Sequence, residues 1–182
     1  MQRIAELILE GCFLKRVPRS GYQFLGAGSE SVAEHVYCAM FIAFILAKLN
    51  PEADSGRLIA MCLVHDLPEA RTGDLNYVQK KYLTPDETSA MNHCLEGLAF
   101  ADEIKGLLDE FNTGTSLEAR LAHDADQLSL VVDLKTLQGV GYATPQSWLP
   151  NVTARLKTET AKQLSEALLG LSHDGWWRKL FS

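Results

Sequence analysis

Apolar and polar residues follow a helical period along almost the whole chain. The first amphipathic helix is indicated by apolar residues at three- and four-residue spacing: Ile4, Leu7, Ile8 and Cys12. Ser31 and Glu34 then have the S-x-x-E form of a capping box, so a second helix is expected to begin there and to run to about Leu49. This helix is apolar nearly all round, which predicts a central, buried position.

The rest of the chain continues the helical pattern. Asn50-Pro51 ends the long helix, and a third helix is expected from about Ser55 to His65, before Pro68 stops it. Further helices are expected at 85–100, 102–111, 117–137 and 152–169, with a short one at 175–181. No segment alternates long enough to predict a strand, and there is no repeat or linker. The expectation is an all-α fold, with residues 1–182 in a single domain.

Composition and charge narrow the classes of partner. Of 182 residues, 47% are apolar and 22% are charged, and the net charge is −6. This balance is ordinary for a soluble globular protein and argues against binding to a nucleic-acid polymer or to a membrane surface. The apolar run from Val36 to Leu49 contains Lys48 and is expected to be too short to cross a bilayer. The start of the chain lacks the pattern of a signal peptide.

The four cysteines suggest a reducing compartment. Cys12, Cys38, Cys62 and Cys94 are far apart and lie among apolar residues, without a CxxC spacing. Buried free thiols in the cytoplasm are the expected arrangement.

Candidate chemistry begins with histidines in apolar surroundings. His35 lies on the apolar face of the second helix, near the preceding loop, although a lone histidine there can also be an ordinary core residue. His65 and Asp66 end the third helix, and two side chains at a helix end can converge on one ion. Imidazole and carboxylate together suit Mn²⁺, Fe²⁺, Co²⁺ or Zn²⁺. Alternatively, Asp66 and Glu69 form a capping box around Pro68.

A third polar group lies inside the expected helix at 117–137. His123, Asp124 and Asp126 interrupt an otherwise apolar stretch. One of the two aspartates should face the core, where a carboxylate must be paired or bound to a metal. The spacing leaves the choice between Asp124 and Asp126 open.

These motifs, taken in order, resemble the H…HD…D pattern of the HD-domain metal-dependent phosphohydrolases. The matching segments are "SVAEH", "VHDLPEARTGDL" and "HDADQL". Together with "LKRVPRSGY" before the first histidine, they are most similar to the 5′-deoxynucleotidase branch of that superfamily. The motif-bearing core covers about residues 10–140, and the helices at about 152–181 are expected to pack against it around a central metal site.

The resemblance implies roles for individual residues. By this resemblance the metal ligands would be His35, His65, Asp66 and Asp126, and alignment with the family motif favours Asp126 over Asp124. Further roles implied are an acidic catalytic residue at Glu69, a catalytic and substrate-contacting residue at Asp74, and a phosphate-binding arginine at Arg16. Arg19 is a less favoured substitute for Arg16 and is interpreted first as a solvated loop charge. Trp148 could line a base pocket but is interpreted first as a packing residue or dimer contact.

The implied activity is metal-dependent hydrolysis of phosphomonoesters, most specifically removal of phosphate from (deoxy)nucleoside 5′-monophosphates. One divalent ion is expected, Mn, Co, Fe or Zn rather than Mg, and the protein is expected to be a homodimer. The alternatives are hydrolysis of nucleoside triphosphates or guanosine-pyrophosphate signals, and a non-catalytic nucleotide- or metal-binding module. The chain has Val17 where well-known members have an aromatic residue, and its segment "LNYVQKKY" also differs from theirs.

Overall fold

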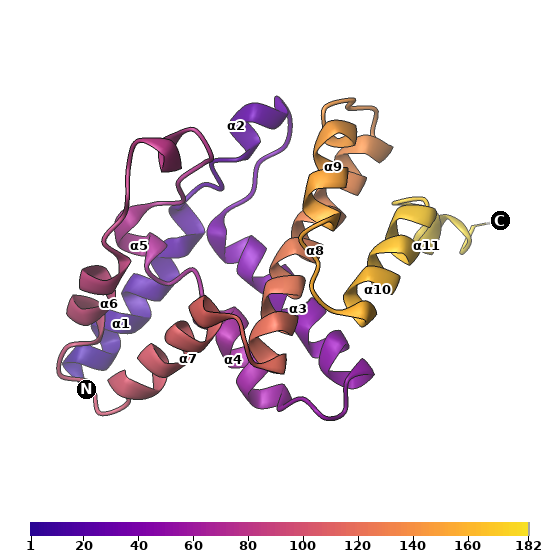
Figure 1. The fold of residues 1–182 in the computed structure, drawn as a ribbon. Helices are drawn as coiled ribbons and strands as arrows, with labels where there is room; N and C mark the ends of the chain where they lie inside the picture. Colours follow the sequence, from indigo (N-terminus) through magenta and orange to yellow (C-terminus); the bar gives the residue numbers. More distant parts are fainter. Residues whose placement is uncertain (182) are drawn as a thin grey trace.

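The computed structural model describes residues 1–181, and these residues form helices without a named strand (Figure 1). The first half contains α1 (Gln2–Phe13), η1 (Leu14–Arg16), α2 (Tyr22–Leu25), α3 (Val32–Leu49), α4 (Ser55–Val64), α5 (Glu69–Thr72) and η2 (Gln79–Lys81). The second half contains α6 (Glu87–Leu95), α7 (Ala101–Thr113), α8 (Leu117–Gly139), α9 (Pro145–Thr153), α10 (Glu159–Gly170) and α11 (Gly175–Arg178). The predicted all-α class is confirmed.

Helices α3, α4 and α8 form the centre of the molecule (Figure 1). Helices α1, α5 and α6 lie to one side, and α9, α10 and α11 lie to the other. Leu46, Leu58 and Leu128, one from each central helix, are fully buried in the main apolar core. Burial of such a side chain contributes about 1.5–3 kcal/mol, so this packing rigidly positions polar groups on the same helices.

The predicted start of α3 is confirmed in detail. The Oγ atom of Ser31 accepts a hydrogen bond from the backbone N–H of Glu34, and the Glu34 carboxylate accepts one from the N–H of Ser31. The expected central position of α3 is confirmed, but its burial is incomplete, because one face exposes Tyr37, Phe41 and Phe44.

By length and composition, α3 is also long enough to cross a membrane, contrary to the expectation from the shorter apolar run, and it is the one such helix in residues 1–181. The core helix of a soluble protein passes the same test, and α3 packs against both α4 and α8.

The helix expected at 152–169 begins only at Glu159, as α10, because residues 152 and 153 end α9, a helix that was not predicted. The carboxylate of Asp124 on α8 accepts hydrogen bonds from the backbone N–H groups of Lys157 and Thr158, between the two helices. Thr158 also caps α10 through its side chain. These contacts come from a residue more than thirty positions earlier, so the local pattern could not predict the break.

The turn after α4 has no side-chain cap. Helix α4 ends at Val64 with His65 as its C-cap residue, and α5 begins at Glu69 without a side-chain hydrogen bond to its first turn. The alternative of a capping box formed by Asp66 and Glu69 is therefore wrong. Gly73 has φ +74°, a conformation that favours glycine, and it directs the chain from α5 toward Asp74.

The cysteines only partly follow the expectation of burial. Cys62 and Cys94 are buried, Cys38 is half-buried and Cys12 is exposed, and all four are free thiols.

Candidate metal centre

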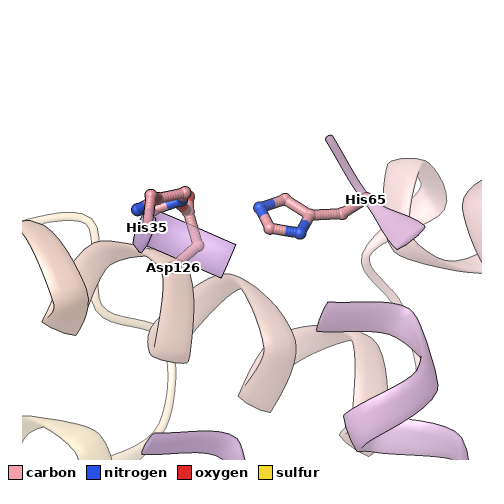
Figure 2. A group of neighbouring side chains, drawn as sticks. All are labelled: His35, His65 and Asp126. Atoms are coloured by element: carbon pink, nitrogen blue, oxygen red, sulfur yellow. The ribbon is translucent and has the colours of Figure 1, made fainter. Parts of the chain in front are cut away.

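Three elements distant in the sequence bring His35, His65 and Asp126 together. His35 lies in the first turn of α3, His65 at the end of α4, and Asp126 in the middle of α8. Each offers one ligand atom, and these atoms all lie within 4.8 Å of one another. Figure 2 shows the His65 imidazole directed toward His35 and Asp126. This geometry is suitable for a single ion.

A neighbour on α8 sets the orientation of the His35 imidazole. The Ser129 hydroxyl donates its proton to the carbonyl oxygen of Asp126, at 2.8 Å. Its oxygen is also 2.8 Å from Nδ1 of His35, so it can accept a hydrogen bond from that ring nitrogen. In the neutral ring, the proton therefore lies on Nδ1 and the lone pair of Nε2 faces the site. This is the arrangement that a metal-binding histidine requires.

His65 reaches the same state through the backbone. Its Nδ1 lies 2.9 Å from the carbonyl oxygen of Cys62, one turn earlier in α4. A carbonyl can only accept a hydrogen bond, so Nδ1 must carry the proton and Nε2 is left with a lone pair. Both imidazoles thus present Nε2 to the common centre.

The carboxylates complete a set of four potential ligands. Oδ2 of Asp66 lies 3.3 Å from Nε2 of His65 and 3.6 Å from Nε2 of His35. Oδ1 of Asp126 lies 3.0 Å from Nε2 of His35. In the absence of an ion, burial alone would raise the pKa of Asp126, but protonated His35 and His65 and the charge of Arg19 hold it well below its usual range.

Unsatisfied atoms indicate that the donor set fits a cation. Nε2 of His35, Nε2 of His65 and Oδ2 of Asp66 are buried, yet none has a hydrogen-bond partner among the described residues. The short contact between His35 and Asp126 does not have hydrogen-bond geometry. Buried polar atoms without partners are costly, and a divalent ion would satisfy these together. Two neutral imidazoles and two carboxylates also balance its charge.

The open choice between the two aspartates of α8 has a clear geometric answer. Asp124 is fully buried, and its oxygens accept hydrogen bonds of 2.6, 2.8 and 2.6 Å from Lys157 and Thr158. Asp126 faces the histidines instead.

A cavity of about 410 Å³ opens over the four potential ligands, and three of them line it. This volume lies in the range of roughly 300–1,000 Å³ typical of small-molecule sites. Its ionisable lining residues are Arg19, Tyr22, His65, Asp66, Glu69, Asp74, Tyr77, Lys80, His123, Asp126 and Arg155. Cations and carboxylates therefore meet in one pocket of an acidic protein.

Arg19 occupies the position at the cavity that was expected for Arg16. Arg16, the last residue of η1, is exposed and does not line the pocket. The interpretation of Arg19 as a solvated charge is wrong. Its Nη1 lies 3.8 Å from Oδ2 of Asp66 and from Oδ2 of Asp74, and its Nε lies 3.9 Å from Oε2 of Glu30. Burial opposes its charge, but the carboxylates of Asp66, Asp74, Asp126 and Glu69 raise the pKa of Arg19 above its ordinary value.

Glu69 and Asp74 both line the cavity, but their surroundings differ. Oε2 of Glu69 is buried without a hydrogen-bond partner, and burial, followed by the charges of Asp66 and Asp74, raises its pKa to about 9. Asp74 accepts a hydrogen bond of 2.8 Å from the backbone N–H of Ser20 and pairs with Arg19. Asp74 thereby connects the loop after α5 to the loop before α3.

Several lining residues were missed by the sequence analysis. Phe111 and His123 are stacked with ring centroids 4.1 Å apart, and Phe111 also contacts the His65 ring. His123 lay next to a candidate aspartate, but only the α7–α8 packing brings it to the pocket. Ser20 is buried with an unpartnered hydroxyl in the lining, and the sequence around it gave no signal of this.

A helical bundle whose two histidines and two aspartates converge at a cavity is typical of a helical metal-binding protein. Comparison with known protein families identifies the family, because the HD domain model matches residues 13–168. The chain therefore belongs to the HD domain family, and the expected fold is confirmed.

Individual relatives agree with this assignment. A 5′-deoxynucleotidase of Danio rerio is 32% identical over 65% of this chain and 62% of its own length. Another of Schizosaccharomyces pombe is 29% identical over 66% of this chain and 65% of its own length. The matches thus span under two thirds of these relatives. A solved conserved hypothetical protein from Pyrococcus furiosus is 27% identical, with a TM-score of 0.75 over 92% of this chain and 99% of that one.

Proposed function

We propose that the chain is a metal-dependent phosphohydrolase that removes phosphate from (deoxy)nucleoside 5′-monophosphates. The observation that carries the proposal is the convergence of two Nε2 lone pairs and two carboxylates below a cavity that also contains Arg19 and Glu69. The names of the relatives from Danio rerio and Schizosaccharomyces pombe support the same reaction.

In this proposal His35, His65, Asp66 and Asp126 hold one divalent ion, with Mn²⁺, Co²⁺, Fe²⁺ or Zn²⁺ favoured over Mg²⁺ by the imidazole ligands. When bound, such an ion lowers the pKa of a coordinated water and offsets charge on the phosphoryl oxygens.

The other residues of the cavity handle the water and the phosphate. Glu69, once ionised, takes a proton from the attacking water or orients it. The new bond forms between the water oxygen and phosphorus, the bond to the 5′-oxygen breaks, and that oxygen takes up a proton. Arg19 donates two hydrogen bonds to the phosphate, the role expected for Arg16. Asp74 holds Arg19 and the backbone of Ser20 in position, which supports a positioning role rather than proton donation.

The test is phosphate release from a panel of nucleoside mono-, di- and triphosphates, with each metal supplied separately to chelator-treated protein. Turnover of monophosphates is expected with at least one of the four favoured ions. Glu69→Gln should lower kcat at least about 100-fold, within the range of general acid–base catalysis, while the bound metal per chain stays unchanged. Release of pyrophosphate or triphosphate would support the other phosphohydrolase alternative. If the protein binds nucleotides but releases phosphate from none of them with any metal, the result would support a non-catalytic module.

The expected homodimer and cytoplasmic location remain part of the proposal. On α3, Tyr37, Phe41 and Phe44 share one exposed face at four- and three-residue spacing, which suits contact with a second copy of the chain. Light scattering should give the mass of a dimer, and Phe41→Asp should give that of a monomer. The treatment of residues 1–182 as one HD domain is also a prediction.

A further inference from the structure

The cavity above the candidate metal centre has an aromatic end. Tyr77, Leu130, Trp148 and Arg155 line it there, and the same residues also line a neighbouring cavity of about 370 Å³. The cavity over the candidate metal centre and the neighbouring cavity toward α9 therefore share these four side chains as a common wall. These residues have no role in the proposed chemistry at phosphorus.

Trp148 presents an unstacked ring in this region. It comes from α9, is half-buried, and packs against a second apolar cluster that includes Leu25 and Leu149. Among residues 1–181 no other aromatic ring contacts it, whereas Phe111 and His123 near the metal centre are stacked on each other. Gly21 lies beside the six-membered ring, and an added Cβ would be 3.8 Å from it. Glycine at this position leaves the ring accessible.

Tyr77 and Arg155 also line this end. Tyr77 is 59% exposed in the segment after Asp74, and the Arg155 guanidinium lies 5.2 Å from the centre of its ring. In the described part of the chain, no carboxylate lies within ion-pair distance of Arg155, whose hydrogen bond to Gln127 is long at 3.5 Å. Its guanidinium donors are thus available to a ligand.

We propose that Trp148, Tyr77 and Arg155 form the subsite for the nucleobase of the substrate. The base stacks on Trp148, Tyr77 flanks it, and Arg155 donates hydrogen bonds to acceptors on its edge. This inference rests on the proposed function. A nucleoside monophosphate is anionic at one end and planar and aromatic at the other, and the cavity has the matching division. Stacking tolerates every base, while a guanidinium pairs best with two adjacent acceptors, such as O6 and N7 of guanine.

The experiment compares dGMP with 2-deoxyribose 5-phosphate, which has the phosphate and the sugar but no base. Trp148→Ala should raise KM for dGMP by about 5- to 150-fold, the range for loss of one stacked base. It should leave kcat, and both constants for deoxyribose 5-phosphate, within about twofold. Trp148→Phe should recover most of the loss. Trp176→Ala is the matched control, since Trp176 is 70% exposed and lines neither cavity.

Tyr77→Ala is a second test of the subsite, needed because loss of the Trp148 ring could disturb the packing of the second apolar cluster. Tyr77 lies in an exposed segment, and its removal should raise KM for dGMP with the melting temperature unchanged. Tyr82→Ala, at a position that is 82% exposed, is the control. Equal KM values for dGMP and deoxyribose 5-phosphate in the unmodified protein would overturn the subsite. An equal rise for both compounds in Tyr77→Ala and Trp148→Ala would overturn it as well.

Binding of deoxyguanosine, measured calorimetrically, separates the subsite from the proposed reaction. This nucleoside has no phosphate to hydrolyse. If the protein releases phosphate from no monophosphate but binds deoxyguanosine, and both variants lose that binding, the function fails and the subsite stands. If it hydrolyses dGMP but binds deoxyguanosine equally in all variants, the subsite fails and the function stands.

Discussion

Asp124 and Asp126, two positions apart on α8, hold their carboxylates against unrelated neighbours. Asp124 accepts three hydrogen bonds from the segment between α9 and α10. Asp126 lies 3.0 Å from His35, in the candidate metal centre. Nearly opposite faces of one helical turn thus hold the bundle together and supply a candidate ligand, and the two roles should separate by mutation.

Asp126→Asn should abolish metal binding, because a neutral amide is a much weaker ligand than a carboxylate. Asp124→Asn should keep one ion per chain but lower the free energy of unfolding by about 2 kcal/mol, since an amide NH₂ cannot replace an oxygen that accepts backbone bonds. Elemental analysis of the purified protein and urea unfolding measure the two quantities. Loss of metal in both variants, with equal destabilisation, would contradict this separation.

Ser129→Ala removes the group that fixes the protonated nitrogen of His35. Loss of such a supporting hydrogen bond typically weakens metal affinity by about 10–100-fold. A metal titration of chelator-treated protein measures the change. Ser165→Ala is the matched control: Ser165 is also buried, but its hydroxyl has no partner and lies outside the cavity lining. Similar affinities in the two variants would remove the role assigned to Ser129.

The two arginines of the loop before α3 should differ in their effect on substrate binding. Arg19→Ala should raise KM for a monophosphate by about 10–100-fold, the size expected for lost charged hydrogen bonds. Arg16→Ala should leave KM unchanged, because Arg16 is exposed outside the cavity. Steady-state kinetics at two salt concentrations measures both. The opposite result would restore the role that the family resemblance implied for Arg16.

The pH dependence of stability should reveal Glu30. Burial, followed by the charge of Asp133, raises the pKa of Glu30 from 4.5 to about 8. Between these values the folded protein keeps a proton that the unfolded chain has released, so the free energy of unfolding falls as pH rises. The slope is at most about 1.4 kcal/mol per pH unit for one proton. Urea unfolding from pH 5 to 9 should show a flatter profile for Glu30→Gln, and an unchanged profile would contradict the assignment.

Local pattern predicted the helices well because most of them carry their own start and stop signals. Ser31 and Glu34 cap α3 as expected, and α4 ends at Val64, one residue before the expected end. The break between α9 and α10 was missed, since Asp124 holds it from elsewhere in the chain. Patterning identifies an apolar face, but it does not identify which distant side chain interrupts a helix.

The part of the candidate site that could be predicted from the sequence consists of polar residues at positions where a helix should be apolar. His35, His65 and Asp66 were indicated by polar side chains in apolar helices, and they do converge. Arg16 and Arg19 could not be distinguished from sequence, because three positions in a loop decide whether a side chain enters the pocket. Their direction depends on η1 and on the contact between Ser20 and Asp74.

The candidate ligands meet only in the assembled bundle, and this affects when an ion can bind. His35 and its supporting Ser129 are 94 positions apart in the chain. An unfolded chain offers only the adjacent pair His65 and Asp66, so it should bind an ion weakly. We therefore expect an ion to bind the folded bundle, and each tenfold excess over its dissociation constant adds about 1.4 kcal/mol against unfolding.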